Sequence, residues 1–222
     1  VGMSNLMNSS GVIATDVSAV GTAYLSTAAT SYGNDKAIFA YGYNGSAKVN
    51  KSNLISNEGV VASDTTGVGS ARVKPAANGY GTGGNALFAF GYISNVSNIQ
   101  NLVSSSGVIA TDSTGVGAAR DSLAAAGYGT GLAIFGYGQD ASGGDNAIST
   151  TNLVSSVGVV GSDVTGVGTV RYALAAVSYG GDKAVFSGGY VSGVGTTAVS
   201  NKVSNTGVVA SDTGAVGTVR YH

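Results

Sequence analysis

The chain has 222 residues, of which 43% are hydrophobic and only 9% are charged, with a formal net charge of −1. This balance excludes the basic stripe that nucleic-acid binding requires, and Ser, Thr, Asn and Gly must solvate most of the surface. The chain has no cysteine, which excludes disulfides and zinc–thiolate sites, and no apolar run approaches the length of a membrane helix, so we expect no membrane insertion.

The N-terminal segment has neither the basic region nor the apolar region of a signal peptide. The chain begins with Val1 instead of Met, so we expect a processed or excised product.

One sequence pattern recurs along the whole chain and predicts a single repeat domain over residues 1–222. A segment that starts with Gly and ends with Asp recurs at steps of 48, 48, 51 and 49 residues. An Asn stands six residues before each of these glycines, and a Val-Gly pair follows each Asp. The glycines that mark the repeat are Gly11, Gly59, Gly107, Gly158 and Gly207.

Each repeat predicts four short strands, because runs rich in Val, Ile, Phe, Tyr or Ala are bounded by Gly, Asn, Asp and Thr. In the fourth repeat the order is strand c (Asn152–Ser155), strand d (Gly158–Ser162), strand a (Leu174–Tyr179) and strand b (Ala184–Gly188). Helices are disfavoured by the shortness of the runs and by their frequent glycines.

An all-β unit of about 48 residues and four strands is typical of a β-propeller blade. The rival interpretation is a β-solenoid, which a period of this length fits poorly. The sequence gives four complete blades plus a c–d half blade, and we favour a five-bladed ring with one incomplete blade. Two alternatives remain, a fragment of a longer array and four blades that close alone. A protein partner or homo-oligomer that completes the half blade is therefore expected.

The repeat also resembles a known family. The order Arg171, a small-residue strand, Tyr179-Gly180 and then the run from Ala184 to Gly188-Gly189 is similar to the kelch-type propeller repeat. The chain departs from that repeat because it has no Trp and because the Gly-Gly pair is complete only in this copy. The runs Lys36-Ala-Ile-Phe-Ala-Tyr-Gly-Tyr43 and Asn101-Leu-Val-Ser-Ser-Ser-Gly-Val108 are also similar to repeats in marine bacteriophage virion and tail-associated proteins. That resemblance implies a virion or other extracellular setting.

A repeated acid–base pair suggests a structural role. We expect the Asp to cap the turn between strands d and a, and the Arg to bond neighbouring carbonyls or that Asp. The alternative is a ring of identical ligand sites. The first copy has Tyr24 in place of Arg, so we expect the loosest blade junction there. The pairs are Asp64 with Arg72, Asp112 with Arg120, Asp163 with Arg171, and Asp212 with Arg220.

Two sets of residues are candidates for ligand binding. The first set is the tyrosine that ends each strand a, which either packs between blades or offers a stacking platform for sugars. These residues are Tyr32, Tyr80, Tyr128 and Tyr179. The second set lies in the longest of the variable b–c loops, where binding residues concentrate. It consists of Gln139, Asp140, Asp145 and Asn146.

Catalysis finds no support, because the only His is the terminal His222 and the acids are spread one per blade instead of paired. We expect no enzyme activity, no cofactor and no metal site. The favoured function is a non-enzymatic structural or recognition module, and the alternative is a multivalent lectin that binds surface glycans through equivalent sites on several blades.

Overall fold

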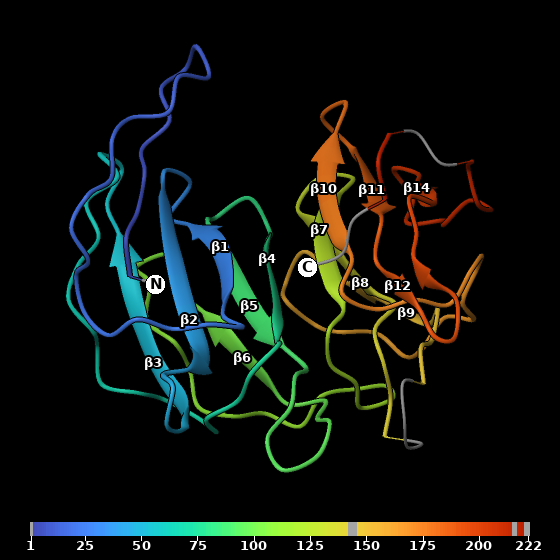
Figure 1. The fold of residues 1–222 in the computed structure, drawn as a ribbon, viewed down its shortest axis with the longest axis horizontal. Coiled ribbons are helices and arrows are strands. Elements are labelled where there is room, and N and C mark those ends of the chain that lie inside the picture. The colour runs from blue at the N-terminus through green and yellow to red at the C-terminus, as the bar shows by residue number, and fades with distance from the viewer. Residues whose placement is uncertain (1, 142–145, 215–216, 220–222) are drawn as a thin grey trace.

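The computed structural model describes residues 2–141, 146–214 and 217–219, so Asp145 and Arg220 lie outside the described residues. The described chain is all-β. It forms four three-stranded antiparallel sheets and one two-stranded sheet (Figure 1).

Each three-stranded sheet comes from one repeat. Sheet 1 contains β1 (Ala28–Tyr32), β2 (Lys36–Tyr43) and β3 (Lys48–Ile55); sheet 2 contains β4 (Ala76–Tyr80), β5 (Asn85–Ala89) and β6 (Gln100–Val103). Sheet 3 contains β7 (Ala124–Tyr128), β8 (Leu132–Gly136) and β9 (Thr151–Val154); sheet 4 contains β10 (Ala175–Tyr179), β11 (Lys183–Ser187) and β14 (Ser200–Val203). The fifth, two-stranded sheet is the hairpin of β12 (Tyr190–Val191) and β13 (Gly195–Thr196).

The register is the same in every three-stranded sheet. The Phe of the middle strand always lies opposite the Asn of the third strand, as in Phe88↔Asn101 and Phe135↔Asn152. Because side chains alternate across a strand, this register sends every Phe to the same face of its sheet.

The fourth strand expected in each repeat does not form as a continuous strand. In sheet 2 the outer segment meets β6 at only two isolated bridges, Val103↔Ile109 and Gln100↔Ser113. The outer segment spans one residue more than β6 between these bridges, which is the arrangement of a β-bulge. The side-chain amide of Asn101 fills the interrupted ladder and donates to the carbonyl of Ala110 at 3.0 Å.

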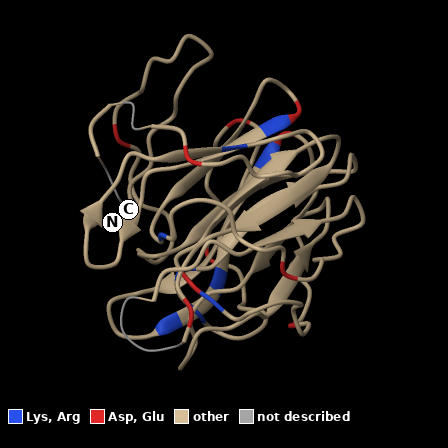
Figure 2. Ribbon diagram, turned by 90° about the vertical axis from the view of Figure 1, so that its right-hand side faces the viewer, with Lys and Arg blue, Asp and Glu red and all other residues tan. Residues whose placement is uncertain are grey.

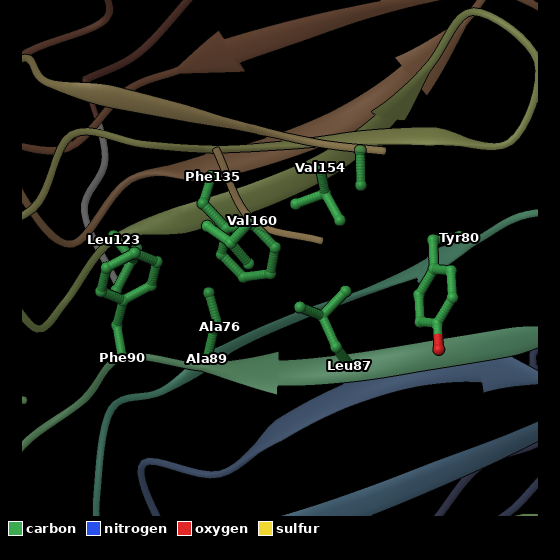
Figure 3. Close-up of a cluster of buried hydrophobic side chains, with 10 residues drawn as sticks. Ala76, Tyr80, Leu87, Ala89, Phe90, Leu123, Phe135, Val154 and Val160 are labelled. Carbon is green, nitrogen blue, oxygen red and sulfur yellow. The ribbon is translucent and has the colours of Figure 1, made fainter. Parts of the chain in front are cut away.

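The core is divided between the sheets. One cluster of buried side chains lies at each of the three junctions between consecutive sheets. Figure 3 shows the cluster between sheets 2 and 3, where Phe90 and Leu87 face Phe135 and Val154. The sheets therefore pack face to face. Apolar side chains that alternate along a strand point toward the sheets on both sides.

The first strands of the four sheets lie innermost. β1 contacts β4, β4 contacts β7, and β7 contacts β10. Figure 1 shows these four strands near the middle of the molecule, with β3 and β14 at opposite sides. All four strands line one cavity of about 490 Å³ whose walls carry Ala, Ser, Thr, Asn, Gly and Val. Small residues let the strands approach this common space closely.

Residues 4–17 form an N-terminal hairpin with the same pattern as the outer segments of the sheets. Its bridges are Ser4↔Val17 and Met7↔Ile13. A Cβ added at Gly59 would collide with the side chain of Leu6, so the hairpin packs closely against sheet 1.

Candidate functional site

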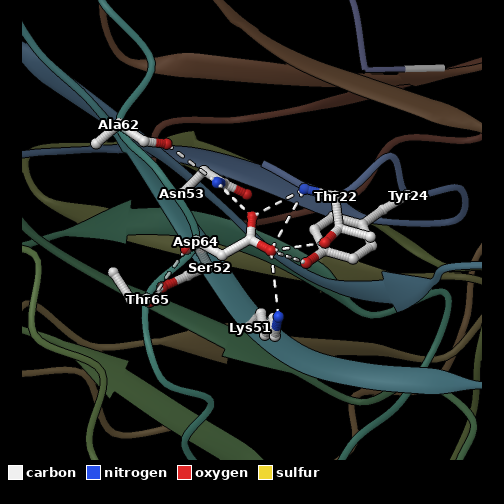
Figure 4. Close-up of polar contacts among 8 residues, drawn as sticks. All are labelled: Thr22, Tyr24, Lys51, Ser52, Asn53, Ala62, Asp64 and Thr65. Atoms are coloured by element: carbon white, nitrogen blue, oxygen red, sulfur yellow. Dashed lines mark hydrogen bonds and ion pairs between the residues drawn. The ribbon is translucent and has the colours of Figure 1, made fainter. Parts of the chain in front are cut away.

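The recurrent aspartates bind the chain segment that enters each sheet. In sheet 1 (Figure 4) the backbone N–H of Thr22 donates to Oδ1 of Asp64 at 3.1 Å, and the Thr22 hydroxyl donates to Oδ2 at 2.8 Å. Nδ2 of Asn53 donates to Oδ1 at 2.9 Å. We call this arrangement the Asp latch. In it an Asp accepts hydrogen bonds from an Asn and from a residue in the segment that leads into the first strand of the sheet.

The latch recurs in the other sheets. Asp112 accepts from Ser70 and Asn101, and Asp212 accepts from Thr169 and Asn201. In sheet 3, Asp163 accepts from Asn152 and from the backbone of Ala118, which offers no hydroxyl. Each latch joins segments more than 40 residues apart, and so fixes where the chain enters the innermost strand.

Hydrogen bonding keeps these carboxylates ionised. Burial raises the pKa of Asp64, but the hydrogen bonds from Asn53 and Thr22 outweigh it, and the net pKa lies well below its ordinary value. The pKa values of Asp112 and Asp212 are lowered against the same effect of burial by their own Ser or Thr and Asn donors.

The described arginines are buried between sheets. Arg72, Arg120 and Arg171 are each 0% exposed. Their guanidinium carbons lie 3.8, 4.1 and 4.1 Å from the ring centroids of Tyr41, Phe90 and Tyr137, which belong to the preceding sheet. On the other side, Nη2 of Arg120 and of Arg171 donates to Oδ1 of the latch Asn in their own sheet at 2.7 Å. Arg120 and Arg171 therefore bridge two sheets, whereas Nε and Nη2 of Arg72 and Oδ1 of Asn101 have no hydrogen-bond partner among the described residues.

The Asp and Arg that stand eight residues apart in sequence serve different sheets. Asp64 holds the entry to sheet 1, whereas Arg72 lies beside the latch of Asp112 in sheet 2. Among the described residues, no Arg lies within 4.0 Å of a carboxylate oxygen. The carbonyl bonds expected for Arg do form, since Nη1 donates to the carbonyl two residues earlier in all three cases.

The aromatic residues under the arginines adopt a strained backbone. Tyr41, Phe90 and Tyr137 have φ of 65°, 64° and 62°, and each is followed by a glycine with positive φ. The fourth copy has Gly188 at this position, with φ of 68°. A non-glycine residue pays a steric cost there, which the ring offsets by stacking on Arg and by meeting the Phe of the next sheet. Sequence analysis missed these residues, although their position before a recurrent Gly was a usable signal.

The four candidate tyrosines differ in exposure. Tyr32, Tyr80 and Tyr128 are 4%, 8% and 5% exposed, whereas Tyr179 is 38% exposed. The ring of Tyr128 lies so close to Gly207 that an added Cβ would be 2.9 Å from it, and Tyr32 and Tyr80 meet Gly107 and Gly158 in the same way. The three buried rings thus pack against the outer turn of the following sheet and offer no open face.

The candidate loop is closed by its own polar contacts. Nδ2 of Asn146 donates to Oδ1 of Asp140 at 2.6 Å, and the Asp140 N–H donates to the carbonyl of Asn146 at 3.1 Å. Gln139 is half-buried and bridges to Ala147. These residues are close together, but they lie apart from the candidate tyrosines, which belong to the innermost strands.

The junction at sheet 1 is the most open. Phe39 is 38% exposed, whereas its counterparts Phe88, Phe135 and Phe186 are 0% exposed. Tyr24, which replaces the Arg, donates its hydroxyl to Oδ2 of Asp64 at 3.0 Å, so it joins the latch without bridging to another sheet.

The described residues were also compared with the requirements of a metal site and of a membrane-spanning helix. They contain no group of three His, Cys, Asp or Glu side chains that would hold a metal ion, and no helix long and apolar enough to cross a membrane. Figure 2 shows acidic and basic residues scattered among the sheets. No protein-family model matches the chain, and no curated protein matches it.

Proposed function

We propose that the chain is a β-propeller module with a non-enzymatic structural or recognition role. The observation that carries this proposal is that the recurrent polar residues bond at the junctions between chain segments. The Asp, Asn and Arg of each described repeat bond to one another's segments or to backbone carbonyls. Such residues hold the repeats together, which supports a structural role for them.

Support for the ring comes from the innermost strands. β1 and β10 belong to the first and last sheets, yet Ser31 and Ser178 line the same cavity. Blades that pack face to face around a central space have this property, and a straight stack of sheets does not.

The surface available for recognition is the set of variable b–c loops. Their lengths and contents differ between repeats, as the extra hairpin β12–β13 in the last loop illustrates. A rigid frame that carries variable loops is the usual arrangement of a binding module. The low charge and the absence of Cys are compatible with an exposed assembly, and we propose a virion or another extracellular surface as the setting. The kelch-type resemblance supports the propeller, and the bacteriophage resemblance supports this setting.

The ring is tested by distance measurement. The chain has no Cys, so spin labels are introduced cleanly at Ser31→Cys and Ser178→Cys, with Ser31→Cys and Asn78→Cys as the matched pair in adjacent sheets. A linear stack of sheets about 10 Å apart would separate the first pair by about 30 Å. We expect a distance well below that value. A distance near it would contradict the ring.

The role is tested on a glycan array with the wild-type chain and Tyr179→Ala, since Tyr179 is the exposed member of its set. A structural or protein-binding module gives no saturable glycan binding. Saturable binding that Tyr179→Ala weakens would replace this proposal by a lectin.

A further inference from the structure

The faces that neighbouring sheets cover elsewhere are uncovered on one side of the molecule. On sheet 4, Val177 is 61% exposed and Tyr179 is 38% exposed, whereas their counterparts Ala126 and Tyr128 on sheet 3 are 2% and 5% exposed. On sheet 1, Phe39 is 38% exposed in contrast to its buried counterparts. We call the space bounded by these side chains and the N-terminal hairpin the open wedge.

The N-terminal hairpin carries a third uncovered face. Met7 and Ile13 are 69% and 67% exposed, while the equivalent bridge in sheet 2, Val103 with Ile109, is 0% and 8% exposed. Among the described residues, no hydrogen bond reaches the backbone N–H or C=O of Asn5 or Met7. These are the groups through which β6 pairs with β5 in sheet 2, so the hairpin presents a free strand edge.

Two cavities border the wedge. Ala29 of sheet 1 and Val177 of sheet 4 line the central cavity of about 490 Å³ together with residues of sheets 2 and 3. Phe39 lines a second cavity of about 180 Å³ together with Met3 and with Ser4 of the N-terminal hairpin. Uncovered side chains of sheet 4, of sheet 1 and of the N-terminal segment thus border these two cavities.

Both halves of a fifth Asp latch are present and separate. Asn5 donates to Oδ1 of Asp16 at 2.8 Å, as the latch Asn does in each sheet, but no other described residue bonds to Asp16. Gly217-Thr218 stands where Gly168-Thr169 stands for Asp212, and a Cβ added at Gly217 would meet nothing within 4 Å.

We propose that the open wedge binds a two-stranded antiparallel β-hairpin of the same type as β7–β8, presented by a partner protein. The second strand of that hairpin would pair with the free edge of residues 4–7, with its Phe opposite Asn5 as Phe88 lies opposite Asn101. One face would cover Val177 and Tyr179, and the other would cover Phe39.

The reason for this occupant is that the chain already contains the interface three times. Each junction is made by a hairpin with small residues and Tyr in its first strand and Phe in its second strand. At these junctions such a hairpin covers the faces that are equivalent to those exposed at the wedge. The proposal rests on the ring of the proposed function, since only a ring brings sheets 1 and 4 to one opening.

The test uses a labelled synthetic peptide with the sequence of residues 122–139, which contains β7 and β8. We expect saturable 1:1 binding to the 222-residue chain by fluorescence anisotropy. Phe135→Asp in the peptide and Val177→Asp in the chain should each weaken binding at least tenfold. The matched control is Val108→Asp, which changes a valine of similar exposure, 65%, at an outer turn. Thermal unfolding of each variant confirms that it is folded.

Three results would overturn the proposal: no saturable binding by the folded chain, equal binding to Val177→Asp, or self-association of the chain that Val177→Asp abolishes. The last result would identify a second copy as the occupant. The spin-label distance reports on the ring alone, so failure of the hairpin proposal and failure of the proposed function are distinguishable.

Discussion

At the scale of single residues, the arginines are the most constrained side chains. Arg120 lies between the Phe90 ring at 4.1 Å and Oδ1 of Asn152 at 2.7 Å, in a fully buried position. Burial lowers its pKa to about 10, so the guanidinium remains charged at neutral pH. A side chain at this position must stack on the Phe90 ring and donate a hydrogen bond to Asn152 at the same time. The planar guanidinium of Arg can do both, whereas the ammonium group of Lys is not planar.

We therefore expect Arg120→Lys to lower the free energy of unfolding by about 2–3 kcal/mol, the usual contribution of a hydrogen bond to a charged group plus lost stacking. Urea denaturation measures the change. Lys48→Arg, an exchange of the same kind beside the Tyr92 ring at a less buried position, is the control and should change stability little. An unchanged midpoint for Arg120→Lys would show that the bridge between the sheets contributes nothing.

The latch carboxylates make stability depend on acid. The pKa values of Asp64, Asp112 and Asp212 are lower in the folded chain than in the unfolded chain, so the unfolded state binds more protons as pH falls. Their contribution is complete at neutral pH and is lost progressively as the pH falls below about 5 toward the folded pKa. We expect the urea midpoint to fall over this range, and Asp112→Asn to reduce the slope. A midpoint independent of pH between about 5 and 3 would contradict the latch energetics.

At the scale of the element, the outer turns separate two contributions to stability. One is the backbone conformation of the turn, and the other is its packing against the neighbouring sheet. Gly207 and Gly11 occupy the same turn in different repeats, with φ of 81° and 79°. An added Cβ at Gly207 would lie 2.9 Å from the Tyr128 ring, whereas at Gly11 it would meet nothing within 4 Å. Both alanine variants carry the backbone strain, and only one disturbs a junction.

Gly11→Ala should therefore cost about 1 kcal/mol, the strain of a non-glycine residue in the left-handed region. Gly207→Ala should cost about 1–3 kcal/mol more, because it overpacks the contact with Tyr128. Thermal unfolding of the two variants side by side measures the difference. Equal losses would mean that the tyrosine and the turn do not constrain each other.

The elements themselves were largely predictable, because glycines and aromatic residues bound each strand. β10 and β11 begin and end within one residue of the expected runs, Leu174–Tyr179 and Ala184–Gly188. The interruption of the predicted fourth strand was not predictable, because a run such as Gly158–Ser162 has the composition of a strand whether or not an inserted residue breaks its ladder. The bulge depends on the amide of Asn152 reaching Gly161, a contact that spacing alone does not specify.

The partners of the repeated residues were also beyond sequence reasoning. All five repeats contain the Asp and four contain the Arg, so the sequence cannot distinguish contacts within a repeat from contacts with the next one. The structure connects Arg171 to Asn201, whereas the short spacing had suggested Asp163. For the same reason, the repeat period alone does not determine whether the sheets close around an axis.

At the scale of the whole molecule, each sheet contacts the sheets that precede and follow it in sequence, so stability should vary from sheet to sheet. Sheets 2 and 3 have a buried cluster on both faces. The N-terminal hairpin, with Met7 and Ile13 mostly exposed, packs against sheet 1 through Leu6 and Gly59. Few buried contacts and solvent-exposed backbone bonds are the conditions for local opening.

Hydrogen–deuterium exchange should therefore follow a definite order. We expect residues 4–17 to exchange first, β10–β14 next because one of their faces is uncovered, and β4–β9 last with protection close to that of global unfolding. Addition of the residue 122–139 peptide should slow exchange in residues 4–17 and in β10 without affecting β5 or β8. If residues 4–17 were as protected as β7 in the isolated chain at every concentration, the wedge would already be closed within one molecule. If that protection rose with concentration, a second copy would cover it.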